Sequence, residues 1–269
     1  MAFVNVKEAV EQAWQRGTAI LAINAVNLET AQGVVRGAER AGRPVILMVS
    51  HNAARYGGLE ELYLIGRTLA RKAEVPVYLH YDHAEDLEDL ERAYALGFDS
   101  AMLEVRLPPL GPEGQTLLRE ARSLAGSRPL EVELEAVEKG GREGRNLELE
   151  DLLELVRIAQ PDWLVVNLGT VHKSLKPQGL DLERLHHLKV LGRPFVLHGG
   201  SSAPLDQLLQ AIALGIAKVN LATAAYKAFT QAVRERVELS WDPREYLGPG
   251  REALAGWLAQ MYRYLPPLG

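Results

Sequence analysis

The chain has 269 residues, a formal charge of −5 and 47% hydrophobic residues, enough to bury the core of one large α/β domain. Charges of both signs are mixed throughout, so no basic footprint indicates a nucleic-acid partner. Because there is no cysteine, disulfides and thiolate chemistry are excluded, and a transition-metal site would need histidine and carboxylate ligands. The first residues lack the features of a signal peptide, and no apolar run reaches membrane-spanning length. We therefore expect a cytoplasmic protein without a membrane partner.

Apolar, strand-like segments alternate with amphipathic, helix-like segments along the chain. The strand-like segments are 18–23, 44–49, 75–79, 100–103, 129–137, 163–167, 195–197 and 217–221. The helix-like segments are 6–16, 28–41, 58–72, the acidic stretch after His83, 113–126, 149–159, 182–190 and 204–214. From Thr223 the chain is mostly helical, with a break around 241–250. About eight strand-then-helix units without a linker predict a single (β/α)8 TIM barrel over 1–269, with an extra C-terminal helical segment.

A doubly wound open sheet is the alternative fold, because continuous apolar strands suit both architectures. Polar side chains follow strands along the whole chain, which favours the barrel, since its strand ends all open onto one mouth. They are Asn24, Asn27, Ser50, Asp82, His83, Glu104, Glu135, His172, His198, Asn220 and Thr223. An open sheet would instead gather them near one switch point.

Three histidines, His83, His172 and His198, follow three different predicted strands. Together they can supply nitrogen ligands and leave a position open for substrate, as in catalytic zinc sites. One strand-end histidine alone more often hydrogen-bonds a neighbouring loop, so their recurrence is what indicates a metal. The histidines at 186 and 187 are predicted at the surface. Those at 51 and 80 stay undecided, with the core as one option for His80.

Two further features lie beside these histidines. Asp82 precedes His83 directly and is placed to act as a general acid or base, the alternative being orientation of a ligand imidazole. Gly199 and Gly200, after His198, allow close backbone approach, and Ser201 adds a donor, so an anion can bind this turn. The plainer interpretation is turn chemistry, with Ser201 as a helix cap.

At these residues the chain resembles the class II, metal-dependent ketose-bisphosphate aldolases, the fructose- and tagatose-1,6-bisphosphate group. The matching stretches are Asn24-Ala-Val-Asn-Leu-Glu-Thr30, His80-Tyr-Asp-His83, Glu133-Leu-Glu135 with Gly140-Gly-Arg-Glu143, Gly169-Thr-Val-His172, His198-Gly-Gly-Ser201, Lys218-Val-Asn220 with Thr223, and the segment 242–251. They span nearly the whole chain in the right order.

The resemblance implies a zinc-dependent aldolase that releases dihydroxyacetone phosphate and glyceraldehyde 3-phosphate from a ketose bisphosphate. It implies zinc held by His83, His172 and His198, with Glu135 at or near the metal. Asp82 would handle the C4 hydroxyl proton as the C3–C4 bond breaks, and Glu143 would exchange the C3 proton of dihydroxyacetone phosphate. The implied substrate and phosphate contacts are Asn27, Ser50, Lys173, Gly199, Gly200, Ser201, Asn220 and Thr223. A homodimer or homotetramer is also implied.

The chain departs from the family pattern mainly around the phosphate groups. Lys173 replaces a glycine that helps bind a monovalent cation, so its ammonium can take over the role of sodium or potassium. The other departures are Gly144 for an acidic residue, Glu104-Val-Arg106 for Asp-Gly-Ser, Ala222 as in tagatose-type members, and Tyr226, beside Lys227, for a basic residue. Metal ligands and base are kept, so the chemistry is predicted and the choice of sugar is open.

Two other functions are consistent with the same residues. A sugar-phosphate-binding paralogue without turnover would keep the pocket and the metal, although the presence of Asp82 and Glu143 argues against it. A barrel hydrolase using zinc-bound water is the third reading. The anion-binding turn beside His198 makes a hydrolase the weakest of the three.

Overall fold

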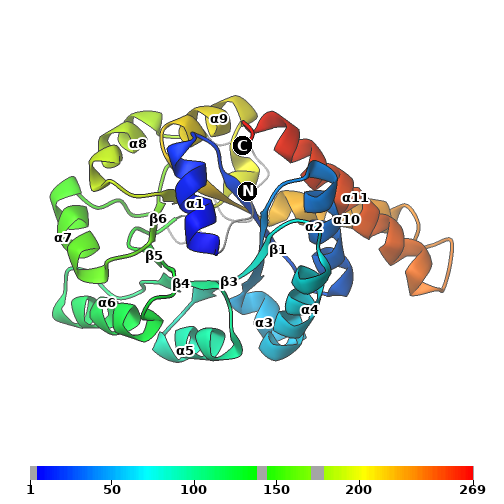
Figure 1. Ribbon diagram of the computed structural model, residues 1–269, viewed down its shortest axis with the longest axis horizontal. Helices are drawn as coiled ribbons and strands as arrows, with labels where there is room; N and C mark the ends of the chain where they lie inside the picture. The colour runs from blue at the N-terminus through cyan, green and yellow to red at the C-terminus, as the bar shows by residue number, and fades with distance from the viewer. Residues whose placement is uncertain (1–4, 138–143, 171–178, 269) are drawn as a thin grey trace.

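The computed structural model describes residues 5–137, 144–170 and 179–268, whose strands close into a barrel (Figure 1). The parallel strands are β1 (Ile20–Asn24), β2 (Val45–Ser50), β3 (Val77–Ala84), β4 (Ser100–Glu104), β5 (Leu130–Glu133), β6 (Trp163–Val166), β7 (Phe195–Leu197) and β8 (Ile216–Leu221). Each pairs with its neighbour in sequence, and β8 pairs with β1. The predicted TIM barrel is confirmed, and the open sheet is excluded because no strand edge is left unpaired among these eight.

Most helices lie outside the barrel, whereas α1 lies across one of its ends (Figure 1). The helices are α1 (Val6–Gln15), α2 (Leu28–Ala41), α3 (His51–Gly57), α4 (Leu59–Lys72), α5 (Leu87–Leu96), α6 (Pro112–Ala125), α7 (Leu149–Ala159), α8 (Leu182–Leu188), α9 (Leu205–Ala213), α10 (Thr223–Arg234) and α11 (Pro243–Tyr264), with short 3₁₀ turns η1 (Lys189–Leu191) and η2 (Gly200–Ser202). Val6 and Val10 of α1 pack with Ile20 and Ile46, near the starts of β1 and β2. α1 therefore closes the amino end, and the carboxyl end is left for a site.

The inward face of the barrel changes character along its length. Side chains of a strand alternate between two faces, so in β1 Leu21 and Ile23 join the outer core whereas Ile20 and Ala22 join the inner one. Toward the carboxyl end, buried polar and charged side chains follow: Asn24, His80, Asp82, Glu131, Glu133, Lys218 and Asn220. Burial of so many polar groups is favourable only when they are paired, which indicates a binding or catalytic site at this end of the barrel.

Two segments near the predicted site differ from expectation. β3 continues beyond the expected end at 79, through Asp82 and His83 to Ala84, because it keeps pairing with β2 up to Ser50. A short helix that was not predicted, α3, begins directly after β2 and is capped by the Ser50 hydroxyl, which accepts from the Ala53 N–H.

The C-terminal helical segment is confirmed, but the predicted break at 241–250 is misplaced. α10 ends at Arg234 and α11 begins at Pro243, running through Pro249. Glycine and proline suggested a break, yet packing against α2 overrides local propensity, as Gly33 and Gly37 let the two helices approach closely. The hairpin between α10 and α11 projects from the barrel (Figure 1).

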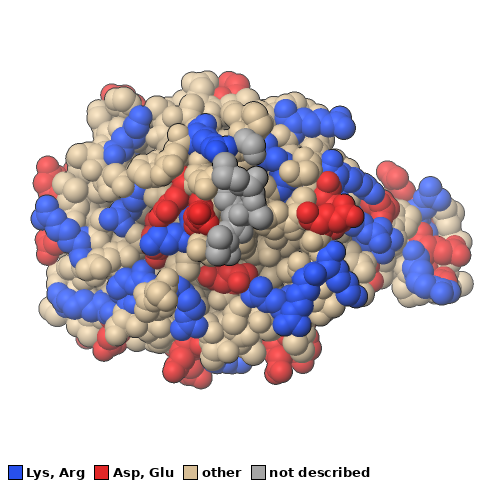
Figure 2. Space-filling view, viewed as in Figure 1, with Lys and Arg blue, Asp and Glu red and all other residues tan. Residues whose placement is uncertain are grey.

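Figure 2 shows basic and acidic side chains interspersed over one face of the molecule. Among the described residues, no helix combines the length and apolar character needed to cross a membrane.

Candidate active site

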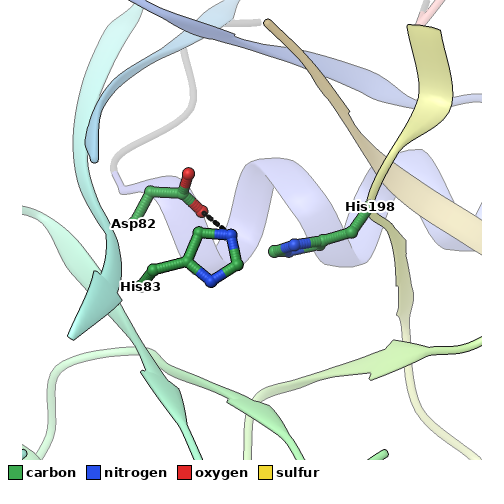
Figure 3. A group of neighbouring side chains, drawn as sticks. All are labelled: Asp82, His83 and His198. Atoms are coloured by element: carbon green, nitrogen blue, oxygen red, sulfur yellow. Dashed lines mark ion pairs between the residues drawn. The ribbon is translucent and has the colours of Figure 1, made fainter. Parts of the chain in front are cut away.

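Three predicted site residues meet at the carboxyl end of the barrel. Asp82 and His83 lie at the end of β3, and His198 follows β7 directly. One potential ligand atom from each lies within 4.8 Å of the others, and all three residues are buried. The two imidazoles face each other edge to face, with ring centroids 5.0 Å apart and planes at 84° (Figure 3). The side chains are close enough to converge on one ion.

The backbone of His83 is strained, and its side chain is held by a carboxylate. Its φ is 64°, in the left-handed region that residues with a Cβ rarely adopt, where the pairing of β3 with β4 shifts register. The Glu104 Oε2 lies 3.0 Å from the His83 Nδ1. A proton on Nδ1, donated to Glu104, directs Nε2 toward Asp82, whose Oδ1 is 3.9 Å away. The bulge thus turns the imidazole into the barrel mouth.

His198 is held by a buried ion pair inside the barrel. Its Nε2 lies 3.0 Å from the Glu131 Oε1, and the Glu131 Oε2 accepts from the Lys218 Nζ at 2.7 Å. The His198 Nδ1 is 3.8 Å from the Glu133 Oε2. Glu131 and the Asn220 Nδ2 both lie within hydrogen-bond distance of Nε2, whereas Glu133 lies on the Nδ1 side.

Asp82 is an ionised carboxylate supported by two amides. Asn24 Nδ2 donates to its Oδ2 at 3.2 Å, and Asn220 Nδ2 donates to its Oδ1 at 3.4 Å. Burial raises the pKa of Asp82, but its electrostatic interactions with His83, His198 and Lys218 and the Asn24 hydrogen bond outweigh burial and set the pKa at about 2. Asp82 can therefore accept a proton or bind a cation.

The composition of the site fits a divalent cation. Four buried carboxylates, those of Asp82, Glu104, Glu131 and Glu133, surround the imidazoles. In the described part of the chain, Lys218 is the only completely buried lysine or arginine. Excess buried negative charge is unfavourable without a counter-charge. Imidazole nitrogen and carboxylate oxygen are ligands that suit zinc.

The turn after β7 packs tightly against the end of β8 and is hydrogen-bonded to the start of α10. Gly199 has a φ of 64°, and a Cβ on Gly200 would lie 2.9 Å from Val219 Cγ1 and 3.2 Å from the Asn220 carbonyl oxygen. The Ser201 hydroxyl accepts from the Ala224 N–H at 3.2 Å, so it links this turn to the first turn of α10. The Ser201 hydroxyl therefore satisfies one N–H of the first turn of α10, and the anion-binding role of this turn stays a prediction.

The model of the class II fructose-bisphosphate aldolase family matches residues 4–267. The chain belongs to this family. It is 34% identical to the fructose-bisphosphate aldolase of Geobacillus stearothermophilus, over 94% of this chain and 93% of that one. It is 31% identical to the sulfofructosephosphate aldolase of Alkalicoccus urumqiensis, again over 94% and 93%. The crystal structure of the YdjI aldolase from Escherichia coli K12 superposes with a TM-score of 0.83 at 25% identity, covering 97% of this chain and 96% of that one.

The carboxylate of Glu135, which the resemblance had placed at or near the metal, is bound by backbone N–H groups and an arginine. Its Oε1 accepts from the Leu147 N–H at 2.9 Å and its Oε2 from the Asn167 N–H at 3.0 Å, and Arg184 also pairs with it. Glu135 therefore joins the segment after β5 to β6 and α8. The Oε2 atom of Glu133, two residues earlier, lies 3.8 Å from the His198 Nδ1.

Other predicted site residues have structural roles or lie outside the described residues. Asn27 caps α2 through a reciprocal pair of hydrogen bonds with Thr30, and Ser50 caps α3. Asn220 contacts both Asp82 and His198, and Thr223 begins α10. The predictions for Glu143, His172 and Lys173 fall outside the described residues.

The structure also resolves the four remaining histidines. His80 is fully buried, and its Nδ1 lies 2.8 Å from the Ser100 hydroxyl. Burial and the charge of Lys218 lower the pKa of His80 well below its ordinary value, so it is a neutral core residue. His51 begins α3 and pairs with Asp89 at 2.8 Å. The pair at 186 and 187 is exposed on α8, as predicted.

Three buried charged residues beside the imidazoles were not predicted as site residues: Glu131, Glu133 and Lys218. The sequence pattern that could have revealed Glu131 and Glu133 is their alternation with apolar residues in one strand, which places both on one face. Lys218 could also have been predicted as a site residue, because a charged residue inside an apolar strand requires a buried partner.

Proposed function

We propose that the chain is a zinc-dependent class II aldolase that reversibly cleaves a ketose 1,6-bisphosphate of the fructose or tagatose type. The products would be dihydroxyacetone phosphate and glyceraldehyde 3-phosphate. The observation that carries this proposal is the convergence of Asp82, His83 and His198 within 4.8 Å at the carboxyl end of a family barrel. Active sites of TIM-barrel enzymes lie at this end.

We assign the metal to His83, His198 and His172, with Glu133 in the neighbouring position that the sequence had given to Glu135. Glu133 lies beside the His198 Nδ1, whereas both oxygens of Glu135 accept backbone hydrogen bonds. A divalent cation held there would supply positive charge next to the substrate carbonyl, where negative charge develops as the bond breaks.

The proton transfers are assigned to two carboxylates. Asp82 would accept the C4 hydroxyl proton as the C3–C4 bond breaks, because it is ionised and its oxygens are oriented by Asn24 and Asn220. The Oδ1 atoms of both asparagines are buried without a hydrogen-bond partner among the described residues. These oxygens are acceptors suited to substrate hydroxyls. Glu143 would exchange the C3 proton of dihydroxyacetone phosphate.

A phosphate of the substrate would bind at the junction between the turn after β7 and the start of α10. Gly199, Gly200 and Ser201 bring the backbone close to this helix start, with Asn220 and Thr223 beside it. Lys173, Asn27 and Ser50 complete the proposed substrate contacts. One relative is a sulfofructosephosphate aldolase. The identity of the substrate's second acidic group, at the other end of the sugar, therefore has to be tested.

The proposal is tested by measuring bound zinc and the cleavage of fructose- and tagatose-1,6-bisphosphate, each with and without chelator. We expect about one zinc per chain, cleavage of at least one sugar, loss of cleavage with chelator and recovery with zinc. Asp82→Asn should lower kcat by about 10²–10⁴-fold with nearly unchanged zinc content, because a proton acceptor is lost. Bound zinc without cleavage of either sugar would instead support a sugar-phosphate-binding paralogue.

A further inference from the structure

Arg106 contacts two carboxylates near His83, those of Glu104 and Glu85. Its Nε lies 3.4 Å from the Glu104 Oε1, and its Nη2 donates to the Glu85 Oε1 at 2.5 Å. The other oxygen of Glu104 accepts from the His83 Nδ1. Glu85 follows His83 by two residues in the chain. One guanidinium therefore joins the carboxylate that orients the imidazole to the segment that continues its backbone.

Glu85 is itself anchored to two helices. Its backbone N–H donates to the Asp89 Oδ2 at 3.2 Å, on α5. The same Asp89 oxygen lies 2.8 Å from the Nδ1 of His51, the first residue of α3, and the His51 Nε2 is 3.9 Å from the Glu85 Oε1. Arg106 thus connects Glu104 to a fixed acidic residue.

His83 requires support of this kind because its backbone is strained. A residue with a Cβ at a φ of 64° is held there only when the surrounding contacts determine the conformation. Glu104 has several rotatable bonds, so it can orient His83 reproducibly only if its own carboxylate is held. Arg106 holds the second oxygen of that carboxylate.

We propose that Arg106 is a positioning residue for the metal ligand His83, acting through Glu104 and Glu85. This inference rests on the proposed metal site. The charge of Arg106 alone would act in the opposite direction, because a guanidinium near the centre repels a divalent cation. Removing Arg106 therefore weakens metal binding if the residue positions His83, and strengthens it if the residue acts only by charge.

The test is the zinc affinity of the apo-protein, measured by competition with a chromophoric chelator. Arg106→Gln is expected to weaken binding about tenfold, the size of effect seen when groups that orient metal ligands are changed. Glu85→Gln should act in the same direction, and the double variant should be weaker than Arg106→Gln by no more than about twofold, since both changes break one link. Arg106→Lys should also weaken binding, because an ammonium does not bridge two carboxylates as a planar guanidinium does.

Arg36→Gln is the matched control, because Arg36 is similarly exposed (43%, against 38% for Arg106) and pairs with Glu252. It should leave zinc affinity unchanged. The visible spectrum of the cobalt-loaded protein reports ligand geometry and should change in Arg106→Gln but not in Arg36→Gln. Unchanged or tighter zinc binding by a folded Arg106→Gln protein would overturn the positioning role and leave the metal site standing. A wild-type protein that binds no zinc would overturn both the proposed function and this inference.

Discussion

At the scale of single residues, the site depends on one buried ion pair. Lys218 and Glu131 are both fully buried, and Glu131 divides its two oxygens between the Lys218 ammonium and the His198 imidazole. Such a pair adds little net stability, because both charges lose their hydration. Removing one partner is costly, since it leaves the other charge buried and uncompensated. Its value here is orientation, as Glu131 holds the His198 imidazole through Nε2.

Lys218→Met is therefore expected to lower the free energy of unfolding by about 3–5 kcal/mol. Combination with Glu131→Gln should recover part of that loss, because the uncompensated charge is then removed. The measurement is urea denaturation of the apo-protein. Arg40→Met, which breaks an exposed pair with Glu252, is the control and should change stability by about 1 kcal/mol or less. A Lys218→Met effect as small as the control would contradict this account.

At the scale of elements, α2 and α11 are in close contact. A Cβ at Gly37 would lie 2.8 Å from the Leu258 Cβ and 2.9 Å from the Ala255 carbonyl oxygen. Neither atom is the end of a flexible side chain, so the helices would have to separate. This contact explains why α11 continues through Pro249, since the part of α11 that follows the proline is held against α2.

Gly37→Ala should consequently destabilise the protein by about 1–3 kcal/mol, as overpacking does in other cores. Gly256→Ala provides the comparison within α11, because Gly256 is exposed and a Cβ there meets nothing within 4 Å. That change should stabilise by up to about 1 kcal/mol through helix propensity. Thermal unfolding of both variants decides the matter; effects of the same sign would refute the proposed close packing.

At the scale of the whole molecule, the barrel is closed by α1 at one end and gathers acidic groups toward the other. A cation that binds only the folded state stabilises it, by about 2.7 kcal/mol when present at 100 times its Kd. Removing zinc with a chelator should lower Tm by about 5–10 °C for a chain of this size, and added zinc should restore it. A Tm that is insensitive to chelator would argue against a metal at His83 and His198.

The sequence by itself was enough to predict the barrel and three residues that meet at its mouth. Eight apolar segments separated by helical patterns allowed one closed parallel sheet, and Asp82, His83 and His198 could be placed at its mouth because strand ends are marked by polar residues. These features are local, since they depend on hydrophobic periodicity and on order along the chain.

Only the tertiary structure decided which carboxylates reach the centre. The Glu133 Oε2 lies 3.8 Å from the His198 Nδ1, whereas Glu135 pairs with Arg184. The alternation of the predicted strand put both on one face, but β5 ends at Glu133 and the chain then turns. The partnership of Glu131 with Lys218 joins β5 to β8, residues 87 positions apart. Periodicity sets the face of a side chain within a strand, whereas bulges, strand ends and contacts across the barrel depend on the closed sheet as a whole.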